Sequence, residues 1–366
     1  MSAGGKKQKN RSSLLVNGVL IFICSIWLLP TLGVFFTSFR DSQDIFNSGW
    51  WAVFPHKEDI DSGEIILDES IDVDGTIQIE GISTTFKELQ KGVTLEDGRK
   101  LTWYGNKRTR RIIVSELKWV GFANNLSFSN YKDVLTGKEI SFTDSGGNEI
   151  TRRGNNLGGA FLNSIAVTIP ATVIPILIAA FAAFGFSWLK FPGRDILFTL
   201  IVAVLVVPLQ ISLVPILQDY TKLQLNGTFL GIWLAHTGFG LPLATYLLFN
   251  YISTLPRELL EAAYIDGASN FTILMQLIIP LSVPALASFA IFQFLWVWND
   301  YLVSLVFLGE KTRVVTYALA SIVGEKGQDW HLLTAGAFVS MLLPMLVFFL
   351  LQRYFVRGMM AGSVKG

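Results

Sequence analysis

Few residues in the apolar parts of this sequence carry reactive groups, and their spacing does not indicate catalysis. The three histidines, His56, His236 and His331, are too scattered along the chain to suggest a metal site. The sequence contains neither a phosphate-binding Gly-x-x-x-x-Gly-Lys-Ser/Thr loop nor a Gly-x-Ser-x-Gly nucleophile turn. We therefore expect a chain that is not an enzyme, with no catalytic residue, no metal and no cofactor of its own.

Two ionisable residues, His236 and Asp300, fall within long apolar stretches. An aspartate at the centre of a membrane-spanning helix costs about 2.5–3.5 kcal/mol. Asp300 lies near the outer end of its stretch, where most of that cost is avoided. A proton relay needs a series of buried acids, and an ion-driven carrier usually shows internal repeats. Neither is apparent, so an ion-driven carrier is disfavoured.

A polar segment from Ser253 to Asn270 separates two apolar stretches and predicts a short helix. Pro256 suits the first turn of a helix. Leu259, Ala262 and Ala263 recur at helical spacing and predict one small apolar face. Such a face fits a groove of another protein, and it fits equally an amphipathic connector lying on the membrane surface.

The same segment predicts a hinge followed by a second helix. Gly267 is suited to end the first helix in a left-handed conformation. The second helix is expected from about Asn270 to Ile279, where Pro280 stops it.

The composition indicates the environment in which these segments lie. The chain has 366 residues, of which 51% are hydrophobic and 16% charged, too few charges for a soluble surface. Apart from a short N-terminal run, the sequence has no basic patch, so we expect no nucleic-acid partner. Six stretches reach the roughly 20 apolar residues that a spanning helix needs: 14–39, 161–189, 195–219, 229–252, 281–308 and 331–352. The first is longer than the apolar region of a signal peptide. We predict an all-α polytopic protein with six transmembrane helices surrounded by membrane lipid.

Lysine and arginine in the short flanks predict the orientation, because cytoplasmic loops carry an excess of these residues. Placing both termini in the cytoplasm puts ten of them inside: Lys6, Lys7, Lys9, Arg11, Lys190, Arg194, Arg257, Arg353, Arg357 and Lys365. Four then lie in short outer loops: Lys222, Lys311, Arg313 and Lys326.

Residues 41–158 differ from the rest, because most acidic residues fall there and several pieces alternate as strands do. Examples are residues 75–81 and 139–143, with turn signals at 74–75, 105–106 and 144–148. We predict three parts: residues 1–40 with the first span, a β-rich extracytoplasmic insert over 41–158, and a five-span core over 159–366. The insert fits a stabilising spacer or a docking surface for a binding protein.

The loop over residues 253–284 resembles a known motif. Glu261-Ala262-Ala263, Gly267 and Leu277-Ile-Ile-Pro280 are similar to the EAA loop of ABC importer permeases. Other segments resemble the maltose-type sugar branch (MalG-like): 130–135, 238–242, 298–301, 352–358 and 361–366. The long insert looks more like that of the alpha-glucoside permeases (AglG-like).

The resemblance implies a permease subunit of an ATP-driven sugar importer in a bacterial-type inner membrane. Its expected partners are a second permease subunit, two ATPase subunits that hold ATP and Mg, and an extracytoplasmic solute-binding protein. The implied ATPase-coupling residues are Glu261, Ala262, Ala263, Asp266, Gly267 and Pro280. The tail residues Gly362, Lys365 and Gly366 would reach between the ATPases.

A sugar path needs aromatic faces with amide or hydroxyl groups. Candidates are Asn163, His236, Thr237, Trp298 and Asn299, although the same residues also fit helix packing. An oligosaccharide or alpha-glucoside is expected. The alternative is a non-sugar solute such as a glycerol phosphate, which should leave a lysine or arginine inside the spans, and none is found.

Overall fold

The computed structural model describes residues 3–121, 126–137, 139–143, 149–154, 156–323 and 329–361. It divides into two compact units, Met1–Phe128 and Ser129–Gly366. The sequence places boundaries near residues 40 and 158 instead. In the structure, the first long helix belongs to the same unit as the larger sheet, and the residue 139–153 hairpin belongs to the helical unit.

The first unit begins with a long apolar helix and continues into a small α/β region. Helix α1 (Ala3–Thr37) contains a stretch long and apolar enough to cross a membrane, Leu14–Thr37. Directly after it, the buried Arg40 guanidinium donates to the carbonyls of Asp44, Ser48 and Gly49 at 2.8–3.1 Å. These bonds fold the chain back through α2 (Ser42–Asn47) and η1 (Trp50–Val53) towards the sheet.

The sheet of this unit is antiparallel, with strand order β1-β6-β5-β4. Its strands are β1 (His56–Ile66), β4 (Val93–Thr94), β5 (Arg99–Tyr104) and β6 (Arg111–Val120). A second sheet pairs β2 (Thr76–Ile79) with β3 (Ile82–Thr85), so the predicted strand near residues 75–81 is confirmed. The 3-10 turn η2 (Lys107–Thr109) precedes β6.

Helix α3 (Phe86–Lys91) closes the core of this unit with a capping box. The Thr85 side chain accepts from the Glu88 N–H, and the Glu88 carboxylate accepts from the Thr85 N–H at 2.9 Å. Hydrogen bonds from Thr85 and Thr84 hold the pKa of Glu88 below its usual value.

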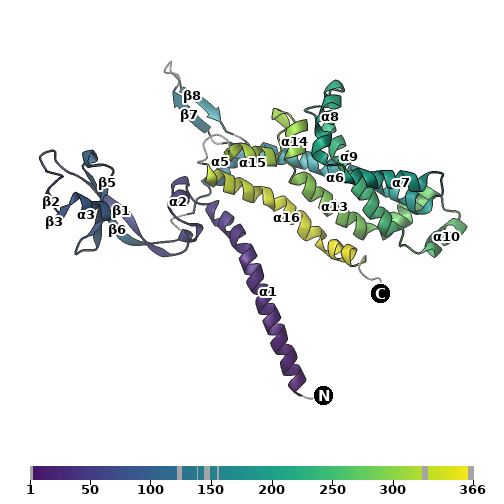
Figure 1. The fold of residues 1–366 in the computed structure, drawn as a ribbon, viewed down its shortest axis with the longest axis horizontal. Helices are drawn as coiled ribbons and strands as arrows, with labels where there is room; N and C mark the ends of the chain where they lie inside the picture. Colours follow the sequence, from purple (N-terminus) through teal and green to yellow (C-terminus); the bar gives the residue numbers. More distant parts are fainter. Residues whose placement is uncertain are drawn as a thin grey trace. The chain divides into compact units, whose positions relative to one another are not determined.

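The second unit is a helical bundle preceded by a small hairpin (Figure 1). Helix α5 (Ser129–Thr136) leads to β7 (Glu139–Thr143), which pairs with β8 (Glu149–Arg153) and confirms the predicted strand at 139–143. The long helices are α6 (Leu157–Trp188), α9 (Phe229–Ile252), α13 (Val283–Trp298) and α16 (Trp330–Ala361). Helix α6 packs along α9, and α13 packs against both α6 and α16.

The all-α polytopic prediction is confirmed, and the described residues contain four to six candidate spans. Four helices are long and apolar enough to cross a membrane, and two bent helix pairs complete the six. In the third span, α7 (Arg194–Ala203) and η3 (Val204–Val206) meet α8 (Leu209–Lys222) at 103°. Pro208 stands at this break, where it cannot supply a helical N–H.

The fifth span is shorter than predicted. Helix α13 ends at Trp298, and the chain restarts as α14 (Leu302–Phe307), followed by η5 (Glu310–Thr312) and α15 (Val315–Val323). Asp300 lies in the turn between α13 and α14 and accepts from the N–H groups of Val303 and Ser304, so it caps α14. A side chain that starts a new helix explains why the long apolar stretch is interrupted.

Pro280 does not stop the second loop helix, contrary to the prediction. The chain runs through α11 (Asn270–Ile273), a π-helical turn (η4, Leu274–Ile278) and α12 (Ile279–Leu281), and bends by 73° only before Val283. In the π-turn the Ile279 N–H donates to Leu274, five residues earlier. Because the π-turn changes the hydrogen-bond pattern at this point, the helix continues although Pro280 has no N–H to donate.

Candidate functional sites: an exposed helical segment and a cavity at a broken span

The predicted hinge at Gly267 is confirmed and has a defined hydrogen-bond pattern. Helix α10 (Arg257–Ile265) ends where Gly267 adopts φ +79°. The Gly267 N–H donates to Tyr264, and the Ala268 N–H donates to Ala263, both at 3.0 Å. These two bonds form a Schellman motif, which requires a left-handed residue at the position of Gly267.

The predicted apolar face of α10, formed by Leu259, Ala262 and Ala263, is largely open, and a neighbouring face packs on the bundle. Leu260 is 2% exposed and Ala263 packs beside it, whereas Leu259 is 42% exposed and Ala262 is also exposed. The face that packs on the bundle is therefore Leu260–Ala263. The adjacent stripe, with Leu259 and Ala262, is left open.

The outer surface of this segment, which we call the docking segment (residues 257–280), mixes apolar and acidic side chains. Ile265 is 86% exposed and Phe271 is 62% exposed, unusually high values for such residues. Glu261, Asp266 and Pro280 are also exposed. Four of the six predicted coupling residues thus have exposed side chains, Ala263 is half-buried, and Gly267 fixes the bend.

Polar bonds fix the angle between α10 and α11. The Ser269 side chain caps α11 by accepting from the Thr272 N–H, and the Tyr264 hydroxyl donates to Asn270 at 2.7 Å. Ile273, Leu274 and Ile278 anchor the second arm in the core cluster that also holds Leu260. The docking segment is therefore a rigid projection.

A groove of about 520 Å³ lies beside the docking segment. Its lining includes Lys190, Arg194 and Arg257 against a single carboxylate, Asp195. The predicted tail contacts, Gly362, Lys365 and Gly366, lie outside the residues that the structure describes.

A second cavity, of about 380 Å³, lies where the third span is broken. Residues 204–209 and Ser212 form one wall, Gly238, Phe239 and Pro242 of α9 form another, and Trp296 of α13 closes it. None of its lining residues is charged. It combines two aromatic rings with one hydroxyl. Pro242 has no N–H, so the Gly238 carbonyl lacks its usual helical donor.

Side-chain donors satisfy three carbonyls that prolines leave without a helical partner. Pro170, Pro175 and Pro344 cannot donate to the carbonyls four residues before them. Trp233 donates to Ala166 at 2.9 Å, Gln293 donates to Ala171 at 3.1 Å, and Trp298 donates to Ser340 at 3.0 Å. Each bond joins two different helices, so the prolines create fixed polar ties inside an apolar bundle.

The five predicted substrate-path residues are not gathered at one surface. Asn163 donates to the carbonyl of Arg313 at 3.0 Å, and Asn299 donates to Leu295 at 2.8 Å. Trp298 is 3% exposed and Thr237 is 7% exposed. Trp298 and Asn163 thus hold helices and connections together, and neither lines the cavity.

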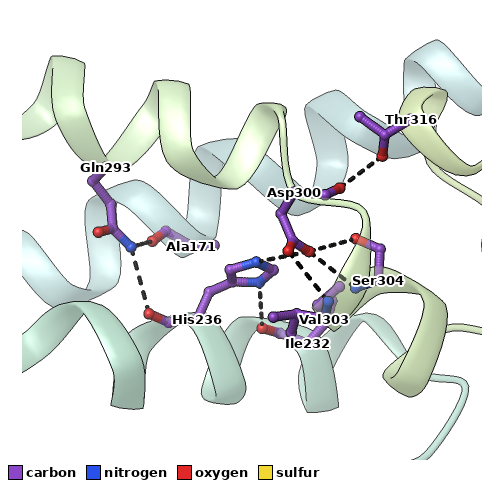
Figure 2. Close-up of polar contacts among 8 residues, drawn as sticks. All are labelled: Ala171, Ile232, His236, Gln293, Asp300, Val303, Ser304 and Thr316. Carbon is purple, nitrogen blue, oxygen red and sulfur yellow. Dashed lines mark hydrogen bonds and ion pairs between the residues drawn. The ribbon is translucent and has the colours of Figure 1, made fainter. Parts of the chain in front are cut away.

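His236, the fifth of these residues, is fully buried and meets Asp300 (Figure 2). Its Nε2 lies 3.5 Å from the Asp300 Oδ2, and its Nδ1 lies 3.1 Å from the Ile232 carbonyl. The two ionisable residues of the apolar stretches therefore form a pair. Among the described residues, no group of three or more His, Cys, Asp or Glu is placed to hold a metal ion.

Sequence reasoning missed the cavity residues Phe239, Ser212 and Trp296. The available signals were Pro208 inside an apolar stretch and the neighbouring Gly238 and Pro242. In transporters, interrupted helices with glycine and proline mark binding sites, because the free backbone groups line a cavity.

Comparisons with known proteins agree with this architecture. Residues 163–361 match the family described as binding-protein-dependent transport system inner membrane component. The chain is 44% identical over 362 residues to the osmoprotective compounds uptake permease protein GgtD of Synechocystis, covering 98% of this chain and 95% of that one. It is 42% identical over 383 residues to the alpha-glucoside transport system permease protein AglG of Rhizobium meliloti, covering 95% and 96%.

A solved structure has the same fold. A chain in the crystal structure of a bacterial ABC transporter involved in the import of alginate aligns with a TM-score of 0.57. It is 17% identical in sequence, and the alignment covers 95% of this chain and 98% of that one.

The bundle of long apolar helices has the length and composition of a membrane-spanning protein. The family match and the near-full-length relatives make the assignment specific. The chain belongs to the binding-protein-dependent permeases and is the membrane permease subunit of an ABC importer.

Proposed function

We propose that this permease imports a small neutral glycoside of the alpha-glucoside class. The near-full-length likeness to an alpha-glucoside permease supports this substrate class. The observation that carries the proposal is the uncharged cavity at the break of the third span. Trp296 and Phe239 offer apolar faces for sugar rings, and Ser212 and the Gly238 carbonyl offer hydrogen-bonding groups.

The cavity also argues against the glycerol phosphate alternative. A buried phosphate needs arginine, lysine or several N–H donors. The lining residues 204–209, Ser212, Gly238, Phe239, Pro242 and Trp296 include no cation. A neutral polyol or sugar needs no such partner.

We further propose that an ATPase subunit binds the docking segment. Ile265 and Phe271 supply exposed apolar surface, Glu261 and Asp266 supply charge, and the Schellman motif at Gly267 supplies rigidity. Two ATPases that hold ATP and Mg, a second permease subunit and an extracytoplasmic binding protein complete the proposed complex. This arrangement requires both chain termini in the cytoplasm of a bacterial-type inner membrane, with the β-rich region of the first unit outside.

Uptake by the reconstituted complex tests the substrate proposal. Proteoliposomes with the full complex should accumulate a labelled alpha-glucoside in an ATP-dependent manner and should not accumulate labelled glycerol phosphate. Trp296→Ala should lower glucoside uptake. The matched control is Trp330→Ala, an exposed tryptophan at the start of α16. Accumulation of glycerol phosphate in place of the glucoside would overturn the proposal.

Site-specific crosslinking tests the docking proposal. Cys24 is the only cysteine, so Cys24→Ser with Ala262→Cys gives one reactive position in the docking segment. We expect a crosslink from this position to the ATPase subunit. A control cysteine at Asp219, an exposed residue of α8, should give none. Equal crosslinking from both positions would contradict a specific docking segment.

A further inference from the structure

The His236–Asp300 pair lies inside the bundle, and the proposed function assigns it no role. Its side chains are 0% and 8% exposed, within a bundle of apolar helices. Burying two charges is costly unless they pair and their remaining polar atoms are satisfied. Asp300 meets this condition, because both of its carboxylate oxygens accept hydrogen bonds. His236 Nε2 makes no hydrogen bond and has the Asp300 carboxylate 3.5 Å away as its polar neighbour.

The neighbours of the pair indicate where its proton lies. His236 Nδ1 faces the Ile232 carbonyl, which only accepts, so this nitrogen carries a hydrogen. Asp300 Oδ1 accepts from the Val303 N–H, and Oδ2 accepts from the Ser304 N–H and hydroxyl. Three donors favour the ionised carboxylate. Its Oδ2 faces His236 Nε2 at 3.5 Å, the separation of an ion pair with a protonated ring.

The ion pair connects two parts of the bundle. On one side, the His236 ring meets the Trp296 ring edge to face, with centroids 5.2 Å apart and an interplanar angle of 74°. On the other side, the Asp300 carbonyl accepts from Thr316 of α15 at 2.6 Å, while its carboxylate caps α14 (Figure 2).

Trp296 is also the aromatic wall of the cavity, which gives the pair a role. Gln293, one helical turn away on α13, donates to Ala171 at 3.1 Å and to the His236 carbonyl at 3.4 Å. The wall is thus tied to α9 at two levels. Gly240 lets Gln293 approach, because a Cβ there would lie 2.6 Å from the Gln293 amide atoms.

We propose that His236 and Asp300 are positioning residues for transport: their buried ion pair holds the Trp296 wall at the distance from α9 that the transported solute requires. This inference rests on the proposed role of the cavity. It predicts that loss of the pair lowers solute transfer for each ATP hydrolysed, while the complex still assembles and hydrolyses ATP.

The test uses the full complex in proteoliposomes, with glucoside uptake and ATP hydrolysis measured together. His236→Gln leaves the Asp300 carboxylate without its cation, and we expect the uptake per ATP to fall about tenfold, or about 1.4 kcal/mol. The neutral double variant His236→Gln with Asp300→Asn should recover part of that loss, because no buried charge then stands alone. Asp219→Asn is the matched control, because its ion pair with Lys222 has the same 3.5 Å separation but is exposed.

A double-mutant cycle distinguishes a positioning role of His236 from a general effect on the stability of the bundle. Trp296→Ala and His236→Gln act on the same wall, so the double variant should lose no more uptake per ATP than the worse single variant. Additive losses, or an unchanged uptake per ATP in His236→Gln, would overturn the proposal.

Failed assembly of a variant and absent glucoside transport by the wild type also have defined consequences for the proposal. If His236→Gln does not assemble, the neutral double variant carries the test, and an assembled double variant without any recovery refutes the pairing. If the wild type transports no glucoside, the substrate proposal fails. The pairing is then judged by the same double-mutant cycle in the melting temperature, where additive effects would refute it.

Discussion

Replacing Gly267 should separate ATP hydrolysis from transport, and the structure gives the size of the perturbation. Gly267 adopts φ +79°, and a Cβ built there would meet nothing within 4 Å. The cost of a side chain is therefore backbone strain alone. For an ordinary residue in the left-handed region this is about 1–2 kcal/mol, and more for a β-branched one.

A strain of this size is enough to shift the docking segment. If the chain relieves it by breaking the Schellman bonds from Gly267 and Ala268, the docking-competent form loses about five- to thirtyfold in population. Gly267→Val should therefore bind the ATPase weakly and show low uptake. Gly267→Asn should retain most activity, because asparagine tolerates the left-handed region.

Binding of purified ATPase to the permease, together with uptake in proteoliposomes, measures both effects. The control is Gly185→Ala in α6, where a Cβ also meets nothing within 4 Å and the backbone is helical. Wild-type binding and uptake in Gly267→Val would refute the role of the bend. An equal loss in Gly185→Ala would show that the effect is not specific to φ.

Three further perturbations act on single contacts of the structure. Gly240→Ala places a Cβ against the Gln293 amide at 2.6 Å and should destabilise the bundle by about 1–3 kcal/mol, seen as a lower melting temperature. Trp298→Phe leaves the Ser340 carbonyl without a donor and should lower the free energy of unfolding by about 1–3 kcal/mol. This loss should shrink in a Pro344→Ala background, where the helical N–H returns. An undiminished loss would contradict this account. The lowered pKa of Glu88 stabilises α3 above the unfolded value of about 4.3 and loses that effect as pH falls through the folded value, so hydrogen exchange in α3 should rise in acid, and Glu88→Gln should remove this pH dependence.

The features that sequence reasoning predicted well are local. The end of α10 at Gly267 depends on one residue that accepts a positive φ, and the fourth span agrees with α9 (Phe229–Ile252). The strands at 76–79 and 139–143 follow from alternation and turn residues. Each of these properties depends on neighbours within a few positions.

The features that were missed depend on residues far apart in the chain. Both halves of the third span are apolar, so hydropathy does not show the 103° break before Leu209. Helical spacing predicted the small apolar face of Leu259, Ala262 and Ala263, but it did not show that the adjacent Leu260 packs inward, because spacing alone does not distinguish two adjacent stripes. The pairing of His236 with Asp300 and the indole donors to proline-freed carbonyls join separate helices, and no local pattern encodes them.

The same distant contacts suggest how the docking segment and the cavity communicate. Helix α13 begins at the 73° bend that follows the docking segment and runs for 16 residues, about 24 Å. Gln293, Trp296 and Trp298 all lie in its last six residues, and they contact α6, α9 and α16 through directed hydrogen bonds or ring contacts. A helix of this length transmits a tilt at its first turn to its last, because its backbone bonds resist bending. We infer that movement of the docking segment turns α13 about its bend and carries the Trp296 wall with it. A flexible Gly-Gly pair in place of Ser282-Val283 should therefore preserve ATPase binding and abolish the dependence of uptake on ATP. Retained ATP-driven uptake in that variant would show that the coupling runs through another element.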